Sequence, residues 1–83
     1  MFNVYAIYNK KHGEIYIGQC KDLKDRLRMH NDRIFKNSYT ARIDGKWVLI
    51  YKEEVSDRKK ALKREKQLKS YRGREFVKNF IPA

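Results

Sequence analysis

Residues 14–31 read EIYIGQCKDLKDRLRMHN and contain the change from strand to helix on which the fold depends. The first part, residues 14–20, is rich in aromatic and β-branched side chains and predicts a β-strand. Asp22 follows at once and can cap a helix in which leucines recur four residues apart on one face. We therefore expect a strand over 14–20 and a helix from Asp22 to about Asn31.

Two further strands are predicted around this stretch. Residues 2–9, FNVYAIYN, have the composition of a strand and are joined to 14–20 by the turn sequence KKHG. This arrangement indicates an antiparallel hairpin. Residues 46–54, KWVLIYKEE, predict a third and buried strand after the polar and aromatic segment 32–45.

The C-terminal part is predicted to be helical. Ser56 can cap a long helix that reaches about Tyr71, and Gly73 fits a C-terminal cap. A short helix follows, with Phe76 and Phe80 four residues apart. The predicted fold is α+β: a small three-stranded antiparallel sheet, in the order β-β-α-β-α-α, flanked by helices.

Charge is the most unusual property of the composition. The 83 residues include 21 Lys and Arg against 10 Asp and Glu, which gives a net charge of +11. Such an excess implies a polyanionic partner, and nucleic acid is the first candidate. A membrane surface is disfavoured, because no predicted helix pairs a basic face with large exposed aromatic side chains.

Length and cysteine content narrow the class of protein. A chain of 83 residues predicts one domain over 1–83. Cys20 is the single cysteine, so neither a disulfide framework nor a zinc cluster is expected. Because the first residues lack a signal-peptide pattern and no apolar run nears the ~20 residues of a membrane span, we expect a cytoplasmic protein.

Two tyrosines and a glycine fall together in the predicted hairpin. With four residues in the turn, Tyr5 lies opposite Gly18 and diagonal to Tyr16 on the same face. Gly18 would leave room for a ligand beside Tyr5. Tyrosine also suits strands in general, so an ordinary structural role for both tyrosines stays open.

Arg26 and His30 lie one turn apart on the predicted helix and border its apolar stripe. They could form one wall of a site. The alternative is a basic helix margin, with His30 at the C-terminal end of the helix.

Glu65 occupies the middle of the apolar stripe of the long helix, with Ala61 and Leu62 before it and Leu68 after it. A buried carboxylate must be paired, protonated or bound to a metal. An ion pair with Lys69, one turn further on, is the structural alternative.

The remaining cations give a generic signal. Residues 57–75, DRKKALKREKQLKSYRGRE, suit contact with phosphates but indicate no sequence preference. The residues that we expect to bind nucleic acid are Lys10, Lys11, Lys63, Arg64, Lys69 and Arg72.

Taken in order, the candidate residues resemble a known family. NVY at 3–5, YIG at 16–18, Arg26, His30 and Glu65 are similar to the motif of GIY-YIG nuclease domains. The chain looks most like short stand-alone members related to the nuclease domain of bacterial excision repair. YIG alone carries no weight, whereas the ordered set is specific and the resemblance covers nearly the whole chain.

Other segments fit the same resemblance. REKQLK at 64–69 and GRE at 73–75 are similar to the family's long helix and ending. Asn3 and Val4 stand where the family usually has Gly and Ile. Asn79 corresponds to the late asparagine that often supports the family's site.

The resemblance implies a metal-dependent endonuclease that hydrolyses phosphodiester bonds in DNA. Glu65 would hold one Mg²⁺ or Mn²⁺, and Arg26 would neutralise charge on the phosphate. Tyr5 would accept a proton from the attacking water, with cationic neighbours favouring its phenolate. His30 would orient Tyr5 or relay the proton, and Tyr16 would hold the phosphate or the water.

A second class of function fits the same charge, namely a nucleic-acid-binding module of this fold that does not cut. A pure binder has no use for a carboxylate on an apolar stripe, which favours the enzyme. Target choice would depend on the core itself, on homodimer formation or on a protein partner.

Overall fold

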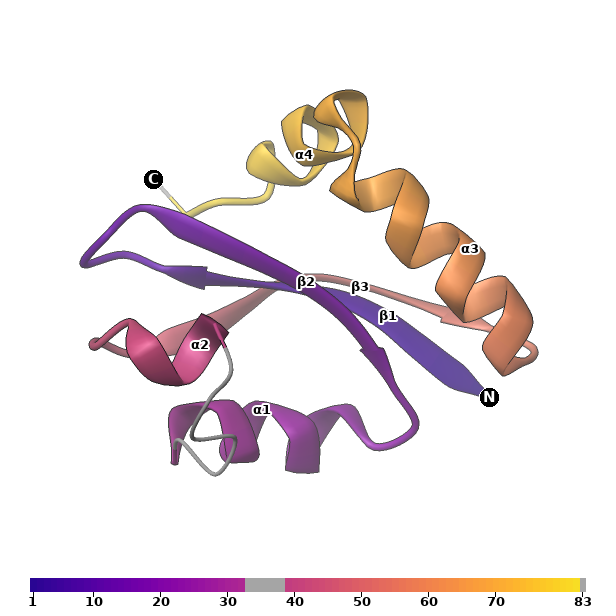
Figure 1. The fold of residues 1–83 in the computed structure, drawn as a ribbon, viewed down its shortest axis with the longest axis horizontal. Coiled ribbons are helices and arrows are strands. Elements are labelled where there is room, and N and C mark those ends of the chain that lie inside the picture. Colours follow the sequence, from indigo (N-terminus) through magenta and orange to yellow (C-terminus); the bar gives the residue numbers. More distant parts are fainter. Residues whose placement is uncertain (33–38, 83) are drawn as a thin grey trace.

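Three antiparallel strands form the centre of the molecule, with helices packed on both faces (Figure 1). The computed structural model describes residues 1–32 and 39–82. In chain order the elements are β1 (Phe2–Asn9), β2 (Glu14–Cys20), α1 (Leu23–Asn31), α2 (Tyr39–Arg42), β3 (Trp47–Val55), α3 (Arg58–Lys69) and α4 (Tyr71–Lys78). This confirms the predicted α+β order, to which the short helix α2 is added within segment 32–45.

The strand order is β2-β1-β3, so β1 is central and the other two strands are edges. β1 pairs with β2 in the predicted register, with Tyr5 opposite Gly18. The prediction of a buried third strand is wrong. Among the described strands β3 pairs with β1 alone, and beyond Trp47 its residues are half-buried or exposed.

The core is divided in two because β1 is covered on both faces. Alternate strand residues face opposite ways, so one set packs under α3 and α4 and the other packs against α1 (Figure 1). The first cluster comprises Val4, Ala6, Ile17, Ala61, Leu68 and Val77, and the second comprises Tyr5, Ile7, Cys20 and Trp47. The tyrosine at position 5 therefore belongs to the core on the α1 side.

Two predicted helix boundaries are corrected by the structure. Asp57, rather than Ser56, caps α3, because its Oδ1 accepts a hydrogen bond from a backbone N–H of the first turn at 2.8 Å. Ser70 ends α3 and begins α4, where its Oγ accepts from the N–H of Gly73 at 3.2 Å. Gly73 thus lies inside α4, and the prediction that it caps the long helix is wrong.

The buried strip of α3 is narrower than predicted. Ala61 and Leu68 are fully enclosed, as expected, whereas Leu62 is 49% exposed. The assignment of Leu62 to the buried stripe is therefore wrong. A helix that rests on a sheet of only three strands buries little more than the single line of side chains that faces the sheet.

Candidate active site

Tyr5 is the most enclosed of the candidate residues. Its side chain is 1% exposed, and its ring lies over Gly18 on the neighbouring strand. A Cβ atom on Gly18 would stand 2.7 Å from Tyr5 Oη and 2.9 Å from Cζ, so glycine is required for this close approach. The Tyr5 side chain fills the space over Gly18, so the prediction that this glycine leaves room for a ligand is wrong. The centroid of the Tyr16 ring is 6.4 Å from that of Tyr5. The two tyrosines and the glycine therefore lie together, as the register predicted.

His30 joins helix α1 to this cluster. Its Nε2 lies 2.8 Å from Tyr5 Oη, and its Nδ1 lies 2.8 Å from Thr40 Oγ1. The ring centroids of His30 and Tyr16 are 5.0 Å apart. A histidine that is 3% exposed and bonded at both ring nitrogens is not part of a solvated helix margin.

Thr40 is the residue that sequence reasoning missed. It lies in α2, is 1% exposed, and accepts a hydrogen bond at its carbonyl from Trp47 Nε1 at 3.3 Å. In the sequence it stands in an irregular polar segment, with no periodic pattern to assign it to a face. Its place beside His30 follows only from the packing of α2 against the end of α1.

Both partners of the Tyr5–His30 hydrogen bond are neutral near pH 7. Burial, followed by the charge of Arg26, lowers the pKa of His30 to about 4. Burial is also the largest cause that raises the pKa of Tyr5, and the nearby Tyr16 adds to it. Arg26 opposes this rise, but burial outweighs it, so the resting Tyr5 side chain is a phenol rather than a phenolate.

Arg26 and Glu65 act on the same hydroxyl from opposite faces of the sheet. Helices α1 and α3 cover opposite faces (Figure 1), yet the charge of Arg26 lowers the pKa of Tyr5 and that of Glu65 raises it. A charge acts through space, so neither side chain has to touch the hydroxyl to shift its pKa.

Glu65 forms the ion pair that was the structural alternative for it. Its Oε2 lies 2.7 Å from Nζ of Lys69, one turn further along α3, and its side chain is 19% exposed. The carboxylate is thus mostly, but not fully, enclosed. A carboxylate has about four lone-pair sites, so the ion pair leaves acceptor capacity for a second partner.

A family model matches this chain over most of its length. The model is that of the GIY-YIG catalytic domain, and it covers residues 1–78. The chain belongs to the GIY-YIG family. GIY-YIG domains are a family of nuclease domains, which supports the predicted activity at this general level. Among curated proteins and among solved structures, nothing matches the chain.

Glu65 is the residue of this GIY-YIG domain that was predicted to hold a divalent cation. Within residues 1–32 and 39–82, no three His, Cys, Asp or Glu side chains gather as a metal-ligand group. A single, partly enclosed carboxylate is a poor match for structural zinc, which takes four protein ligands. It fits Mg²⁺ or Mn²⁺, since Mg²⁺ keeps several waters and takes substrate phosphate as a further ligand.

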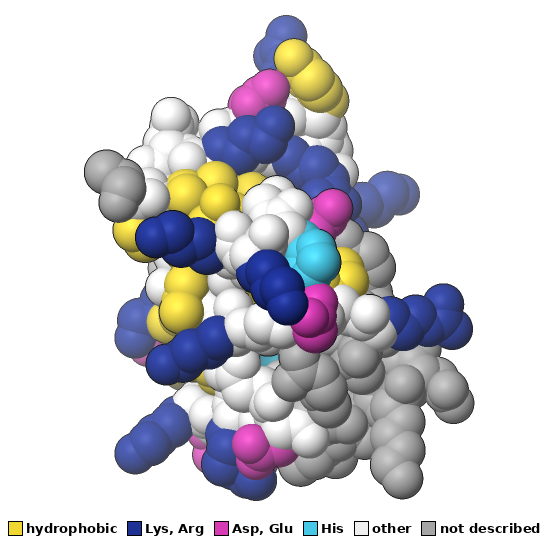
Figure 2. Space-filling model, turned by 90° about the vertical axis from the view of Figure 1, so that its left-hand side faces the viewer, with side chains coloured by type: hydrophobic (Ala, Val, Ile, Leu, Met, Phe, Trp, Pro, Cys, Tyr) yellow, Lys and Arg dark blue, Asp and Glu magenta, His cyan; other side chains and the backbone are white. Residues whose placement is uncertain are grey.

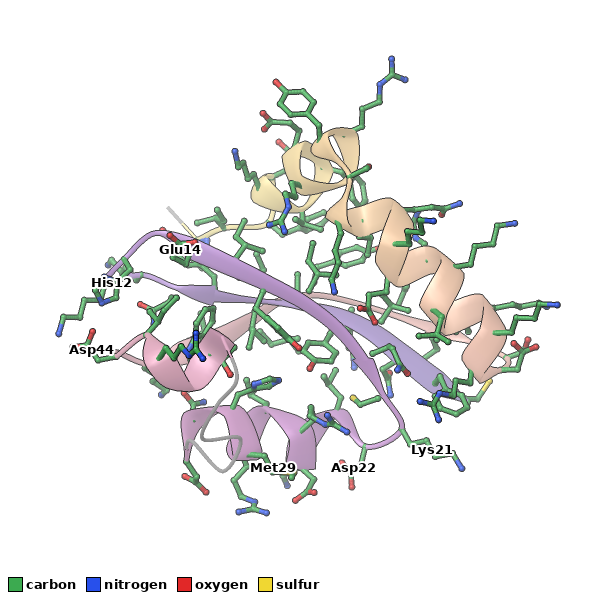
Figure 3. The ribbon with its side chains drawn as sticks, in the orientation of Figure 1. His12, Glu14, Lys21, Asp22, Met29 and Asp44 are labelled. Carbon is green, nitrogen blue, oxygen red and sulfur yellow. The ribbon has the colours of Figure 1, made fainter. Side chains whose placement is uncertain are left out.

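The six cations predicted to bind nucleic acid are spread over the GIY-YIG domain. Three of them form ion pairs: Lys11 with Asp44, Arg64 with Glu53, and Lys69 with Glu65. The other three, Lys10, Lys63 and Arg72, are exposed. Figure 3 shows Asp44 and His12 close together at the hairpin end of the sheet, and Figure 2 shows Lys and Arg side chains across that end of the molecule. Of these, Lys69 lines a hollow together with Tyr16.

Asn79, predicted as a supporting residue, is exposed at the end of α4. Its backbone N–H bonds to the carbonyl of Phe76 at 3.2 Å. Within the described part of the chain, no hydrogen bond joins its side chain to the Tyr5–His30 cluster. In the same residues, no helix has the length and apolar character that crossing a bilayer requires.

Proposed function

We propose that this GIY-YIG domain is a divalent-metal-dependent endonuclease that hydrolyses phosphodiester bonds in DNA. The observation that carries the proposal is the 2.8 Å contact of Tyr5 Oη with His30 Nε2, with the ring of Tyr16 beside both. A structural tyrosine needs one hydrogen-bond partner. It does not require a buried histidine whose second ring nitrogen is held by a further buried hydroxyl.

The hydrogen-bonded chain of Tyr5, His30 and Thr40 supports proton transfer without a free phenolate. If His30 donates its Nδ1–H to Thr40 Oγ1, then Nε2 is an acceptor for the Tyr5 hydroxyl proton. Tyr5 can then take a proton from the attacking water while it passes its own proton to His30. This route suits two groups whose pKa values both favour the neutral form at rest.

The other residues would bind the phosphate. Arg26 presents a planar fork of N–H donors that matches two phosphate oxygens and stabilises the charge that develops on them. Tyr16, on the exposed edge strand, would hold the phosphate or the water by its hydroxyl. Glu65 would hold Mg²⁺ or Mn²⁺, and the bound cation would neutralise phosphate and leaving-group charge.

The test is nicking of supercoiled plasmid DNA in Mg²⁺, in Mn²⁺ and in a chelator. We expect cutting in either metal and none in the chelator. Tyr5→Phe and Glu65→Gln should each lower the rate by a factor of about 10² or more. Tyr8→Phe, on the same strand, and Glu75→Gln, on α4, are matched controls that should keep the rate.

The alternative of a binding module that does not cut makes the opposite prediction. A domain that binds plasmid but leaves it intact in both metals would contradict the nuclease proposal, as would equal rates for Tyr5→Phe and Tyr8→Phe. Target choice by a homodimer or a protein partner stays a prediction, which the measured mass of the domain with and without DNA would test.

A further inference from the structure

Two hollows lie along the outer edge of β2. The first, of about 280 Å³, is lined by Ile15, Tyr16, Ile17, Lys69 and Arg74. The second, of about 410 Å³, is lined by Phe2, Gln19, Cys20, Lys21, Arg26 and Arg58. Neighbouring residues of a strand point to opposite faces, so a hollow that touches Tyr16 and both adjacent isoleucines must straddle the edge of the strand. The second hollow also touches Phe2 of β1, so it lies at the end of β2, and it is reached from both faces because Arg26 comes from α1 and Arg58 from α3.

The lining of both hollows is cationic and contains no acid. Lys69 and Arg74 contribute to the first, and Lys21, Arg26 and Arg58 to the second. Figure 3 shows Lys21 at the end of β2, where the chain turns into α1. Arg74 donates from Nε to the carbonyl of Lys69 at 3.2 Å, which positions a guanidinium whose other N–H groups can bind an anion. Such donors suit phosphate oxygens.

The two hollows lie on either side of the candidate active site. Tyr16 and Cys20 are four residues apart, or about 13 Å along a strand. This length is more than the spacing of neighbouring phosphates along one strand, so the two positions can contact different phosphates of the same strand. Gly18, with the Tyr5 hydroxyl over it, lies between the two positions.

We propose that one strand of the substrate runs along β2, with the scissile phosphate between Tyr16 and Arg26 and the phosphates on either side of it held by Lys69 and Arg74 in the first hollow and by Lys21 and Arg58 in the second. The inference rests on the proposed function, since that function places the scissile phosphate beside Tyr5 and Tyr16. It assigns binding roles to Arg58 and Arg74, which the sequence motif does not single out. It also limits the tight contact to one strand and to the phosphates next to the scissile bond.

The test is binding of a fluorescent ten-nucleotide DNA single strand, followed by anisotropy in a chelator so that nothing is cut. Arg58→Ala and Arg74→Ala should each weaken binding about tenfold. Each should also lower the slope of log affinity against log salt by about 0.7, the value for one lost phosphate contact on a single strand. The double variant should lose about a hundredfold, since Arg58 begins α3 and Arg74 lies in α4, beyond the other end of that helix.

Lys66→Ala is the matched control. It removes one positive charge from the exposed side of α3, outside both hollows, and should weaken binding less than about twofold. If Arg74→Ala disturbs folding, Lys21→Ala with Arg58→Ala tests the second hollow without it. Equal losses for Arg58→Ala and Lys66→Ala would overturn the inference, as would equal affinity for two-nucleotide and ten-nucleotide strands.

The two proposals fail in different ways. A domain that shows these binding losses but never nicks plasmid contradicts the nuclease proposal alone. A domain that nicks plasmid, while Arg58→Ala and Arg74→Ala bind as well as the unchanged chain, contradicts the strand path alone.

Discussion

At the scale of single residues, the hydrogen-bonded chain Thr40–His30–Tyr5 is the feature with the most chemical consequence. The three side chains are at most 3% exposed and are joined by two contacts of 2.8 Å. In a neutral imidazole one nitrogen donates and the other accepts. The partner of Nδ1 therefore influences whether Nε2 can accept the proton of Tyr5, so Thr40 acts on the chemistry through His30 as a positioning residue.

Thr40→Val keeps the shape of the side chain and removes its hydroxyl. We expect the nicking rate to fall by about ten- to a hundredfold, because Nδ1–H of His30 loses its buried acceptor, a loss that costs about 1–3 kcal/mol. The ¹⁵N shifts of the His30 ring should change with the tautomer, which a purely structural role of Thr40 would not require. Thr40→Ser should restore both. Full activity of the valine variant with unchanged ring shifts would rule out the positioning role.

At the scale of elements, the junction of α3 and α4 explains a glycine that the sequence assigned wrongly. The two helices share Ser70 as C-cap and N-cap, so the chain turns with no intervening loop. The first turn of α4 must therefore lie directly on the last turn of α3. A Cβ atom on Gly73 would overlap Gln67 O and the backbone of Leu68, so close approach, rather than a left-handed conformation, accounts for this glycine.

Gly73→Ala should therefore destabilise the domain, although alanine has a higher helix propensity than glycine. In an unobstructed helix the change would add about 1 kcal/mol of stability. Here we expect a loss of about 1–3 kcal/mol in the free energy of unfolding, because the backbone of the junction must shift to admit the methyl group. Urea unfolding followed by circular dichroism measures it, with Lys66→Ala as a control expected to stay within about 0.5 kcal/mol. An alanine variant as stable as the unchanged domain would show that the junction is looser than described.

At the scale of the whole molecule, the net charge of +11 is carried by a body with a radius of gyration of 12.2 Å. That radius is close to the Debye length of about 10 Å at 0.1 M salt, so charges on the two halves repel one another at low ionic strength. Figure 2 shows Lys and Arg side chains spread over the face at the hairpin end. Because His30 is buried in a molecule that already carries this positive charge, the folded state resists protonation of its side chain.

The pH dependence of stability follows from that resistance. The pKa of His30 is about 4 in the folded chain and about 6.5 when the chain is unfolded. Between these values the unfolded state binds the proton and the folded state does not, so stability falls as the pH falls from about 6.5 to about 4. The loss at the lower end should be on the order of 2–3 kcal/mol.

Urea unfolding at pH 7, 5.5 and 4.5 measures this dependence. His30→Gln should flatten the profile over that range, since it removes the buried titrating group. His12→Gln is the control, because His12 lies exposed beside Asp44 at the hairpin end, and it should keep the profile. Similar flattening in both variants would assign the pH dependence to something other than burial of His30.

The sequence by itself determined the three strands, the helices other than α2, their order and the local register. Strand and helix follow from side-chain periods of about 2 and 3.6 residues, and an even turn of four residues suffices to set Tyr5 opposite Gly18. The ordered motif also identified the family that the match over residues 1–78 shows. These features depend on neighbours within a few positions along the chain or directly across a hairpin.

The tertiary structure decided which side chains meet from distant elements. Thr40 contacts His30, and the charges of Arg26 and Glu65 both influence the pKa of Tyr5, because helices pack on both faces of the small sheet. Burial also reversed the expected protonation state of Tyr5, because the loss of water around its hydroxyl raised its pKa more than the charge of Arg26 lowered it. The periodicity of the sequence does not encode these contacts and pKa values. The distances between remote segments and the access of water are set only when the sheet and the helices pack together.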